Sequence, residues 1–414
     1  MQVQTLRKVT IDEALDAVAK HPVRQVAIER VPISAVLAGC IAAEEILAPE
    51  DVPPFDRSSV DGFAVLQRDV RMATSDEPVR LRVIGDVRMG EAPPGPLVAG
   101  TAMRVPTGGA LPAEADAVVK IEDCREDGSF VEILNARYAS DHITRRAADV
   151  KRGDRLCRSG DVLTPAFLGM LAGSGVAEIS VFERPRVALL VTGDELVPPG
   201  ADLRAGQIRD INWLSLDAAL RAIGMITDFA YVQDDRATLA RVLSESLDRC
   251  DAVVISGGSS VGERDYTPAV VSEAGSPGVL VHGIRARPGR PTMLGLVDGK
   301  PVVGLPGNPV SALIMFEVLA RPILQRLYGR ADRVIPVRAA LRAPIEREAD
   351  IERFVPVRLM VGKAGVEAQP LHGTSAHMHI LGFADALVRV PPGLGALPQG
   401  SMLDALPLSR NNAL

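Results

Sequence analysis

Three predominantly apolar runs in the second half of the chain each end in a polar, glycine-containing segment, and this pattern most strongly limits the possible folds. The runs are 187–191, 251–255 and 301–305. Apolar strands of this kind are typical of a sheet that is covered on both faces. Helices are predicted between and after them, at 213–223, 236–249 and from Pro309 onward, with Asn308 as N-cap. Strands that alternate with helices predict a doubly wound α/β domain, here assigned to residues 181–329.

The segments that precede this domain favour other structures. Alternating residues at 79–84, with further predicted strands at 116–121 and 129–133, indicate a β-rich domain over residues 50–137. Two helices are predicted before it, one that follows a capping box at Thr10–Glu13 and one over 34–48. Residues 138–180 are expected to rejoin residues 1–49 in a mixed α/β linker domain, so that the β-rich domain is an insertion.

After residue 329 the pattern again becomes that of β-structure. Residues 355–359 and 386–390 alternate between apolar and polar side chains, and Pro and Gly separate the runs. We therefore expect a small C-terminal β-barrel over residues 330–414. The fold class predicted for the whole chain is multidomain α/β plus β.

Composition excludes several classes of protein. A net charge of -6 argues against a nucleic-acid partner, which usually requires a basic face. The 4 cysteines lie far apart and form no CxxC pair, which disfavours a disulfide framework or a zinc site. The chain has no signal-peptide pattern and no apolar run of about 18 residues, so we expect a cytoplasmic protein without a membrane partner.

The loops that follow the three apolar runs carry the candidate chemistry. They are 192–195, 256–262 and 306–311, and the carboxyl ends of parallel strands are where α/β sheets bind ligands. The Ser/Gly loop suits a phosphate group, although a tight turn without a ligand is an equally good interpretation. Glu195 and Asp265 are carboxylates of the kind that hold Mg²⁺ beside phosphates; alternatively, Glu195 only caps a turn.

Two further loops stand out. The arginines of the segment 285–291 can clamp an oxyanion bidentately, or they belong to a solvated surface. The segment 54–65 mixes acidic and serine residues with apolar anchors, which suits either an ordered loop that reaches another subunit or an Asx-type turn.

These residues together resemble the molybdopterin molybdenumtransferases, a family that includes the C-terminal region of gephyrin. The resemblance covers about residues 8 to 408. It rests on six motifs in the same order along the chain: Pro54-Phe55-Asp56 with Ser58 and Asp61-Gly62; Thr107-Gly108 before Leu111-Pro112; Thr192-Gly193-Asp194-Glu195-Leu196; Ser256-Gly257-Gly258; Ser260-Val261-Gly262-Glu263 with Asp265-Tyr266; and Leu305-Pro306-Gly307-Asn308-Pro309-Val310-Ser311-Ala312.

The resemblance implies a reaction and a set of site residues. In this family molybdate is inserted into adenylylated molybdopterin, AMP is released and Mg²⁺ assists. Molybdopterin adenylyltransferase and molybdoenzyme maturation factors are the implied protein partners. The implied subunit has four domains and forms a homodimer with the active site between subunits. Asp61, Glu195 and Asp265 are the implied catalytic residues, and Glu195 and Asp265 also hold the metal. The implied substrate-binding residues are Thr107, Asp149, Gly257, Gly258, Ser260, Arg287, Arg290, Pro306, Asn308, Pro309, Ser311 and Arg353.

The chain also departs from the family pattern around the expected oxyanion site. Arg287 and Arg290 replace the usual lysines, Ile211 replaces a serine, and His377 and His379 stand in a stretch that is usually serine-rich. Two alternatives therefore stay open: an adenylyltransferase-type activity on molybdopterin, and a non-catalytic ligand-binding or scaffold paralogue. Molybdate and tungstate are equally compatible with the pattern.

Overall fold

The described part of the chain forms two compact units. The computed structural model describes residues 8–258, 266–329, 334–362, 365–374 and 376–408. One unit is residues 30–181, and the other combines the residues before and after that segment. Within these described ranges, none of the helices is both long enough and apolar enough to cross a membrane.

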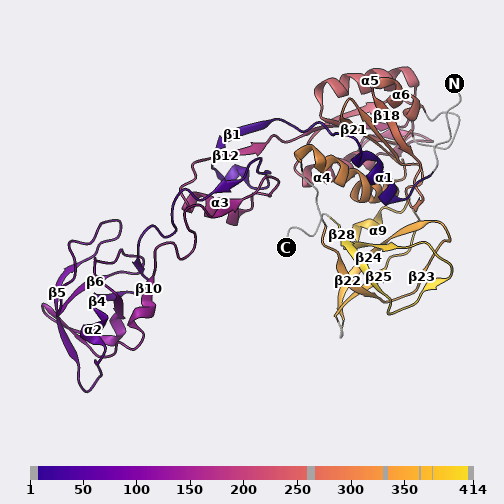
Figure 1. Ribbon diagram of the computed structural model, residues 1–414. Helices are drawn as coiled ribbons and strands as arrows, with labels where there is room; N and C mark the ends of the chain where they lie inside the picture. The colour runs from indigo at the N-terminus through magenta and orange to yellow at the C-terminus, as the bar shows by residue number, and fades with distance from the viewer. Residues whose placement is uncertain (1–7, 259–265, 330–333, 363–364, 375, 409–414) are drawn as a thin grey trace. The chain divides into compact units, whose positions relative to one another are not determined.

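A six-stranded mixed sheet lies at the centre of the larger unit (Figure 1). Its strand order is β16-β13-β17-β21-β20-β18; the first four strands are parallel, and β20 runs antiparallel to both of its neighbours, β21 and β18. The strands are β16 (Ile226–Val232), β13 (Arg186–Thr192), β17 (Ala252–Ser256), β21 (Lys300–Leu305), β20 (Met293–Val297) and β18 (Pro277–His282). The three predicted apolar strands are confirmed, and every residue of β17 is buried.

The antiparallel edge of this sheet follows from one turn. Strands β20 and β21 are joined at Asp298 and Gly299, which adopt φ values of 51° and 83°. Positive φ at both central residues is typical of a tight type I′ hairpin turn, for which an Asp-Gly pair is well suited. The sequence pattern predicted a parallel sheet. This prediction is wrong at one edge, because a hairpin rather than a helix joins β20 to β21.

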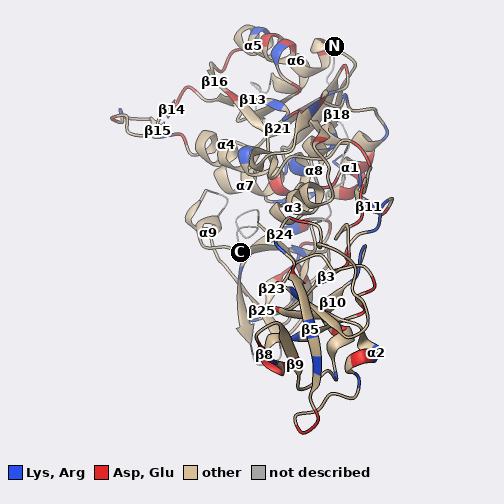
Figure 2. Ribbon diagram, turned by 90° about the vertical axis from the view of Figure 1, so that its left-hand side faces the viewer, with Lys and Arg blue, Asp and Glu red and all other residues tan. Residues whose placement is uncertain are grey.

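Helices cover both faces of the sheet, as expected for a doubly wound fold (Figure 1). Helices α5 and α6 lie on one side, and α4 and α1 lie on the other. The helices are α1 (Ile11–Ala19), α4 (Asn212–Ala222), α5 (Arg236–Arg249), α6 (Thr267–Ala274) and α7 (Pro309–Met315). The predicted capping box of Thr10 with Glu13 is confirmed, and Asn308 stands at the N-cap position of α7. Helix α5 is capped by Asp235, whose carboxylate accepts from the Thr238 amide at 2.9 Å. Helix α5 carries both acidic and basic residues (Figure 2). Two of its residues, Arg241 and Glu245, form an ion pair at 2.8 Å, and both side chains are exposed.

The C-terminal segment closes into a five-stranded barrel. Strand β24 pairs with both β25 and β26, which completes the ring β24-β25-β22-β28-β26. The strands are β22 (Val337–Leu341), β24 (Glu352–Gly362), β25 (Gly365–Pro370), β26 (Ala386–Val390) and β28 (Met402–Pro407). The predicted strands 355–359 and 386–390 are confirmed. The short strand β19 (Ala286–Arg287) adds to β24 in parallel and connects the barrel to the α/β domain.

The smaller unit buries apolar residues on a six-stranded sheet, which carries two hydrophobic clusters, and in a second core outside that sheet. A six-stranded sheet, β7-β4-β6-β5-β9-β8, packs around Phe63, Leu81 and Ile133. Its strands are β4 (Gly62–Val65), β5 (Val79–Asp86), β6 (Thr101–Val105), β7 (Ala117–Lys120), β8 (Cys124–Asp127) and β9 (Phe130–Ile133). The second core is built around Leu163 and Ile179, with α3 (Pro165–Gly173), β2 (Ile46–Leu47) and β11 (Arg155–Cys157) nearby. The boundaries of the four predicted domain segments remain predictions.

The helix predicted over residues 34–48 is wrong. A short 3-10 helix (Ala35–Leu37) is followed by Gly39 at φ 85°, and Ile41 and Ala42 then form bridges to Val162 and Val181. Pairing with distant strands in the second core overrides the local helical pattern, since propensity is a weak determinant beside tertiary contacts.

We expect Leu220→Ala to destabilise the α/β domain by about 2–5 kcal/mol, because Leu220 is fully buried and its loss leaves a cavity. The single tryptophan, Trp213, lies on the same helix and stacks on Phe229, so its fluorescence during urea unfolding reports on this domain. Leu214→Ala is the matched control, because Leu214 on α4 is 59% exposed. Equal effects of the two substitutions on the unfolding free energy would contradict the packing described above.

Candidate functional site

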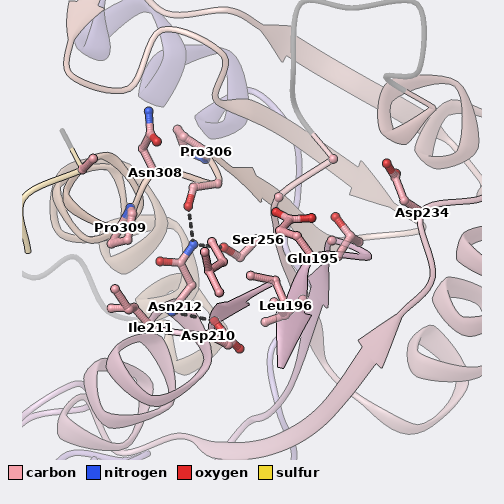
Figure 3. Close-up of a pocket in the computed structure, with 18 of the residues that line it drawn as sticks. Glu195, Leu196, Asp210, Ile211, Asn212, Asp234, Ser256, Pro306, Asn308 and Pro309 are labelled. Carbon is pink, nitrogen blue, oxygen red and sulfur yellow. Dashed lines mark hydrogen bonds between the residues drawn. The ribbon is translucent and has the colours of Figure 1, made fainter. Parts of the chain in front are cut away.

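A cavity of about 1010 Å³ opens at the carboxyl ends of β13, β17 and β21, within the larger unit (Figure 3). The three loops that follow these strands all contribute to its wall, as the sequence pattern predicted. The lining residues are Val191, Thr192, Gly193, Glu195, Leu196, Ile208, Arg209, Asp210, Ile211, Asn212, Asp234, Ser256, Gly257, Gly258, Pro291, Pro306, Gly307, Asn308, Pro309 and Ala376.

Glycines let the first two loops pack tightly against each other. Gly257 and Gly258 adopt φ values of 93° and 66°, which other residues rarely tolerate. A Cβ atom at Gly257 would lie 2.4 Å from the Thr192 carbonyl oxygen, so only glycine fits there. The backbone of Gly257 and Gly258 therefore lies at the cavity wall without side chains of its own to cover it, which allows an anionic group to approach it closely.

The side chain of Asn212 joins the second loop to the third, that is, the loop after β17 to the loop after β21. Its Nδ2 donates to the Ser256 hydroxyl and to the Gly307 carbonyl oxygen, both at 2.8 Å (Figure 3). Ser256 is the last residue of β17, and Gly307 follows β21. Asn212 itself is only 6% exposed, so these bonds are shielded from water. One amide group thus sets the spacing between two of the loops that form the cavity.

Asp210 holds the start of helix α4 and, with it, Asn212. The Asp210 Oδ1 accepts from the Asn212 amide at 2.8 Å and from the Trp213 amide at 3.2 Å, which satisfies donors at the helix N-terminus. Asp210 also affects Tyr231 on the edge strand β16. Burial, followed by the charge of Asp210 and its hydrogen bond, raises the pKa of Tyr231 to about 12, so the phenol stays protonated at neutral pH.

Glu195 places a carboxylate at the cavity wall immediately after β13 (Figure 3). A side chain at Gly193 would meet the two Glu195 carboxylate oxygens at 2.9 and 3.0 Å, so the glycine leaves room for this group. Asp194 points elsewhere, because its carboxylate accepts from the Asp234 amide at 3.4 Å. Among the residues that the structure describes, no group of three or more His, Cys, Asp and Glu side chains is arranged to hold a metal ion.

The predicted site residues of the larger unit divide into three groups. Glu195, Gly257, Gly258, Pro306, Asn308 and Pro309 all line the cavity. Ser260 and Asp265 lie outside the described residues. Arg287, Arg290, Ser311 and Arg353 do not belong to the lining, although Pro291 next to Arg290 does. Ser311 is only 4% exposed, in the first turn of α7.

Arg287 and Arg353 lie together where the α/β domain meets the barrel. They are register partners on the parallel strands β19 and β24. The Glu348 carboxylate lies 3.0 Å from the Arg287 guanidinium and 4.0 Å from that of Arg353, with one oxygen atom common to both distances. The structure thus brings two of the predicted oxyanion ligands together, with a carboxylate that the sequence pattern did not suggest.

Asp61 and Thr107 lie together in the smaller unit. The Thr107 amide donates to the Asp61 carboxylate at 2.8 Å. The neighbouring Gly62 must be glycine, because a Cβ there would lie 1.9 Å from the Val119 carbonyl oxygen. Asp149 is exposed, and its amide donates to the Val52 carbonyl oxygen.

The segment 54–65, which carries Asp61, is anchored through Asp56. Burial raises the pKa of Asp56, but the Arg146 amide and the Arg145 guanidinium outweigh it, and the net pKa is lowered. The Asp56 carboxylate therefore stays charged and keeps its 2.7 Å hydrogen bonds to both arginines. These contacts order the segment that carries Asp61.

Asp210 and Asn212 are among the cavity residues that the sequence did not identify as site residues, and Ser256 was noted only as part of its motif. Asp210 and Asn212 drew notice only because the residue between them departs from the family pattern. The available signal was an Asp two residues before an Asn at the start of a predicted helix, which is a typical N-terminal arrangement. The contact of Asn212 with loops 44 and 95 residues away had no local signature.

Comparison with known proteins covers nearly the whole chain. Three family models match in order: the MoeA N-terminal region (domain I and II) at residues 9–175, a probable molybdopterin binding domain at 188–326, and the MoeA C-terminal region (domain IV) at 338–408. A crystal structure of the molybdopterin biosynthesis MoeA protein from Pyrococcus horikoshii is 36% identical with a TM-score of 0.81, and it covers 97% of this chain and 99% of that one.

Curated relatives agree with this match. Molybdopterin molybdenumtransferase 2 of Mycobacterium tuberculosis strain H37Rv is 33% identical over 376 residues, which is 90% of this chain and 93% of the relative. The molybdopterin molybdenumtransferase of Staphylococcus aureus strain COL is 30% identical over 370 residues, or 88% of each chain. The resemblance drawn from the motifs is confirmed, and the chain belongs to the molybdopterin molybdenumtransferase family, with MoeA-type domains along its length.

Proposed function

We propose that this protein is a molybdenumtransferase of molybdenum-cofactor biosynthesis, which inserts molybdate into adenylylated molybdopterin and releases AMP. The observation that carries the proposal is the cavity in which Glu195 and the Gly257–Gly258 loop meet at the carboxyl ends of the sheet. This is where an α/β domain binds phosphorylated ligands. The relatives that bear the transferase name match nearly the whole chain, not only the α/β domain.

The chain's own groups suit a ligand that contains a phosphoanhydride. The uncovered backbone of Gly257 and Gly258 lets phosphate oxygens approach the loop. Asn308 and Pro309 begin helix α7, which follows β21. The amides in the first turn of this helix add positive potential at the cavity. With the Asn212 bonds holding both loops, the anhydride is oriented by a rigid wall rather than by flexible side chains.

The oxygen-rich wall of the cavity also fits a magnesium ion. Mg²⁺ is usually held by one or two carboxylates together with substrate phosphates, so a three-carboxylate protein site is not required. Glu195 would supply one carboxylate, and Asp265, outside the described residues, is the predicted second. When bound, the ion would offset negative charge on the anhydride oxygens.

Basic side chains are needed for the second reactant, because molybdate is a dianion that must approach a phosphorylated ligand. Arg287 and Arg353 are register partners on the neighbouring strands β19 and β24, and Arg290 precedes the cavity residue Pro291. We propose that these arginines bind the oxyanion. We further propose a cytoplasmic homodimer in which Asp61, Thr107 and Asp149 of one subunit complete the site of the other.

The purified full chain should release AMP from adenylylated molybdopterin when Mg²⁺ and molybdate are added together. Chromatographic measurement of AMP, with tungstate as a parallel oxyanion, tests this outcome. No release above background with either oxyanion would refute the transferase proposal. Consumption of ATP with free molybdopterin would instead favour the adenylyltransferase alternative, and tight ligand binding without release would favour the scaffold alternative.

Glu195→Gln should reduce AMP release by about 100-fold or more, because it removes the charge that is proposed to hold the cation beside the anhydride. The thermal midpoint should stay near that of the wild type, since Glu195 is exposed. Glu245→Gln on α5 is the matched control, because it removes an equal charge from a residue that pairs with Arg241 and does not line the cavity. Wild-type AMP release by the Glu195 variant would exclude this role.

Asn212→Ala should lower AMP release by about tenfold or more and destabilise the α/β domain by about 1–3 kcal/mol. Both effects follow from the loss of two buried hydrogen bonds that hold the Ser256 and Gly307 loops. Trp213 fluorescence during urea unfolding and the AMP assay measure them. Ser215→Ala is the control, because the Ser215 hydroxyl donates to the Ile211 and Asn212 carbonyl oxygens at the start of the same helix. Similar losses in both variants would contradict the assigned role of Asn212.

A further inference from the structure

The proposed oxyanion-binding arginines already share an anionic partner within the chain. Glu348 Oε1 lies 3.0 Å from the Arg287 Nη1 and 4.0 Å from the Arg353 Nε. Because Arg287 and Arg353 are register partners on neighbouring strands, their side chains leave the sheet on the same face. The carboxylate is therefore positioned between two guanidinium groups, as a small tetrahedral oxyanion would be.

The backbone around Glu348 holds this arrangement in place. The Glu348 carbonyl oxygen accepts from the Gly393 amide at 2.9 Å, and Glu348 forms an isolated bridge with Ile351. Arg353 is also anchored, because its Nη1 donates to the Glu346 carbonyl oxygen. The side chain of Arg287, by contrast, is 70% exposed, whereas those of Glu348 and Arg353 are 30% and 29% exposed. The carboxylate is thus the more fixed member of its pair with Arg287, and Arg287 is the member with freedom to change partners.

We propose that Glu348 is an internal competitor for the oxyanion and a determinant of its affinity in this chain. A bound dianion must displace the carboxylate from the guanidinium groups or bear repulsion from it, and either effect weakens binding. After release of the product, the carboxylate returns to the arginines and screens them from other anions. This inference rests on the proposed function, because it assumes that Arg287 and Arg353 face the oxyanion.

Glu348→Gln should bind molybdate about two- to fivefold more tightly than the wild type, since partly exposed charges of this kind have modest effects. Isothermal titration of the full chain with molybdate alone, without Mg²⁺ or nucleotide, measures the change. The gain should shrink at high salt because added ions screen the repulsion. Glu346→Gln is the matched control, because its exposed side chain lies two positions away on the same segment and removes the same charge.

A second variant tests whether the effect acts through the arginines. In the double variant Glu348→Gln with Arg353→Gln, the gain in affinity should disappear. The inference is overturned if Glu348→Gln binds molybdate no more tightly than the wild type, if Glu346→Gln shows the same gain, or if neither the wild type nor the variant binds molybdate. Failure of the proposed function is distinguishable, because it would appear as absent AMP release while the binding difference persists.

Discussion

The cavity depends on one buried amide. Asn212 donates from a single nitrogen to the end of β17 and to the loop after β21, and Asp210 fixes the helix turn from which it does so. Buried hydrogen bonds of this kind contribute little net free energy but are expensive to leave unmade. Their consequence here is geometric: the two loops cannot move independently. If the wall binds an anion as proposed, it is ordered before the ligand arrives, which would lower the entropy cost of binding.

Charge of opposite sign is distributed over different parts of the larger unit. The cavity wall carries the carboxylates Glu195, Asp210 and Asp234 together with Arg209, whereas Arg287 and Arg353 lie at the junction of β19 and β24. Two anionic reactants cannot be brought together by cationic residues alone without strong retention of the products. Under the proposed function, the carboxylates would favour a divalent cation beside the phosphate groups, and the arginines would provide permanent charge for the oxyanion. Each reactant would then bind where its own counter-charge lies.

The sequence predicted the strands β13, β17 and β21 correctly, because a strand that is buried on both faces consists of a continuous run of apolar residues. The prediction failed over residues 34–48, because pairing of Ile41 and Ala42 with Val162 and Val181 decides that segment and has no local signature. The antiparallel edge of the sheet was available in principle. Asp298-Gly299 between two apolar runs is a strong hairpin signal.

The same contrast explains which parts of the candidate site could be read from the chain. Glycines and carboxylates directly after buried strands indicate a ligand site at the carboxyl ends of those strands. Glu195, Gly257 and Gly258 could therefore be predicted to line it. The arginines that could bind an oxyanion could also be named from the sequence. The partner of Arg287 could not, because Glu348 lies 61 residues away and reaches it only through the registration of β19 with β24. A sequence pattern identifies which charges are present, but tertiary pairing decides which of them are already neutralised, and so the affinity of an anion site is a property of the fold.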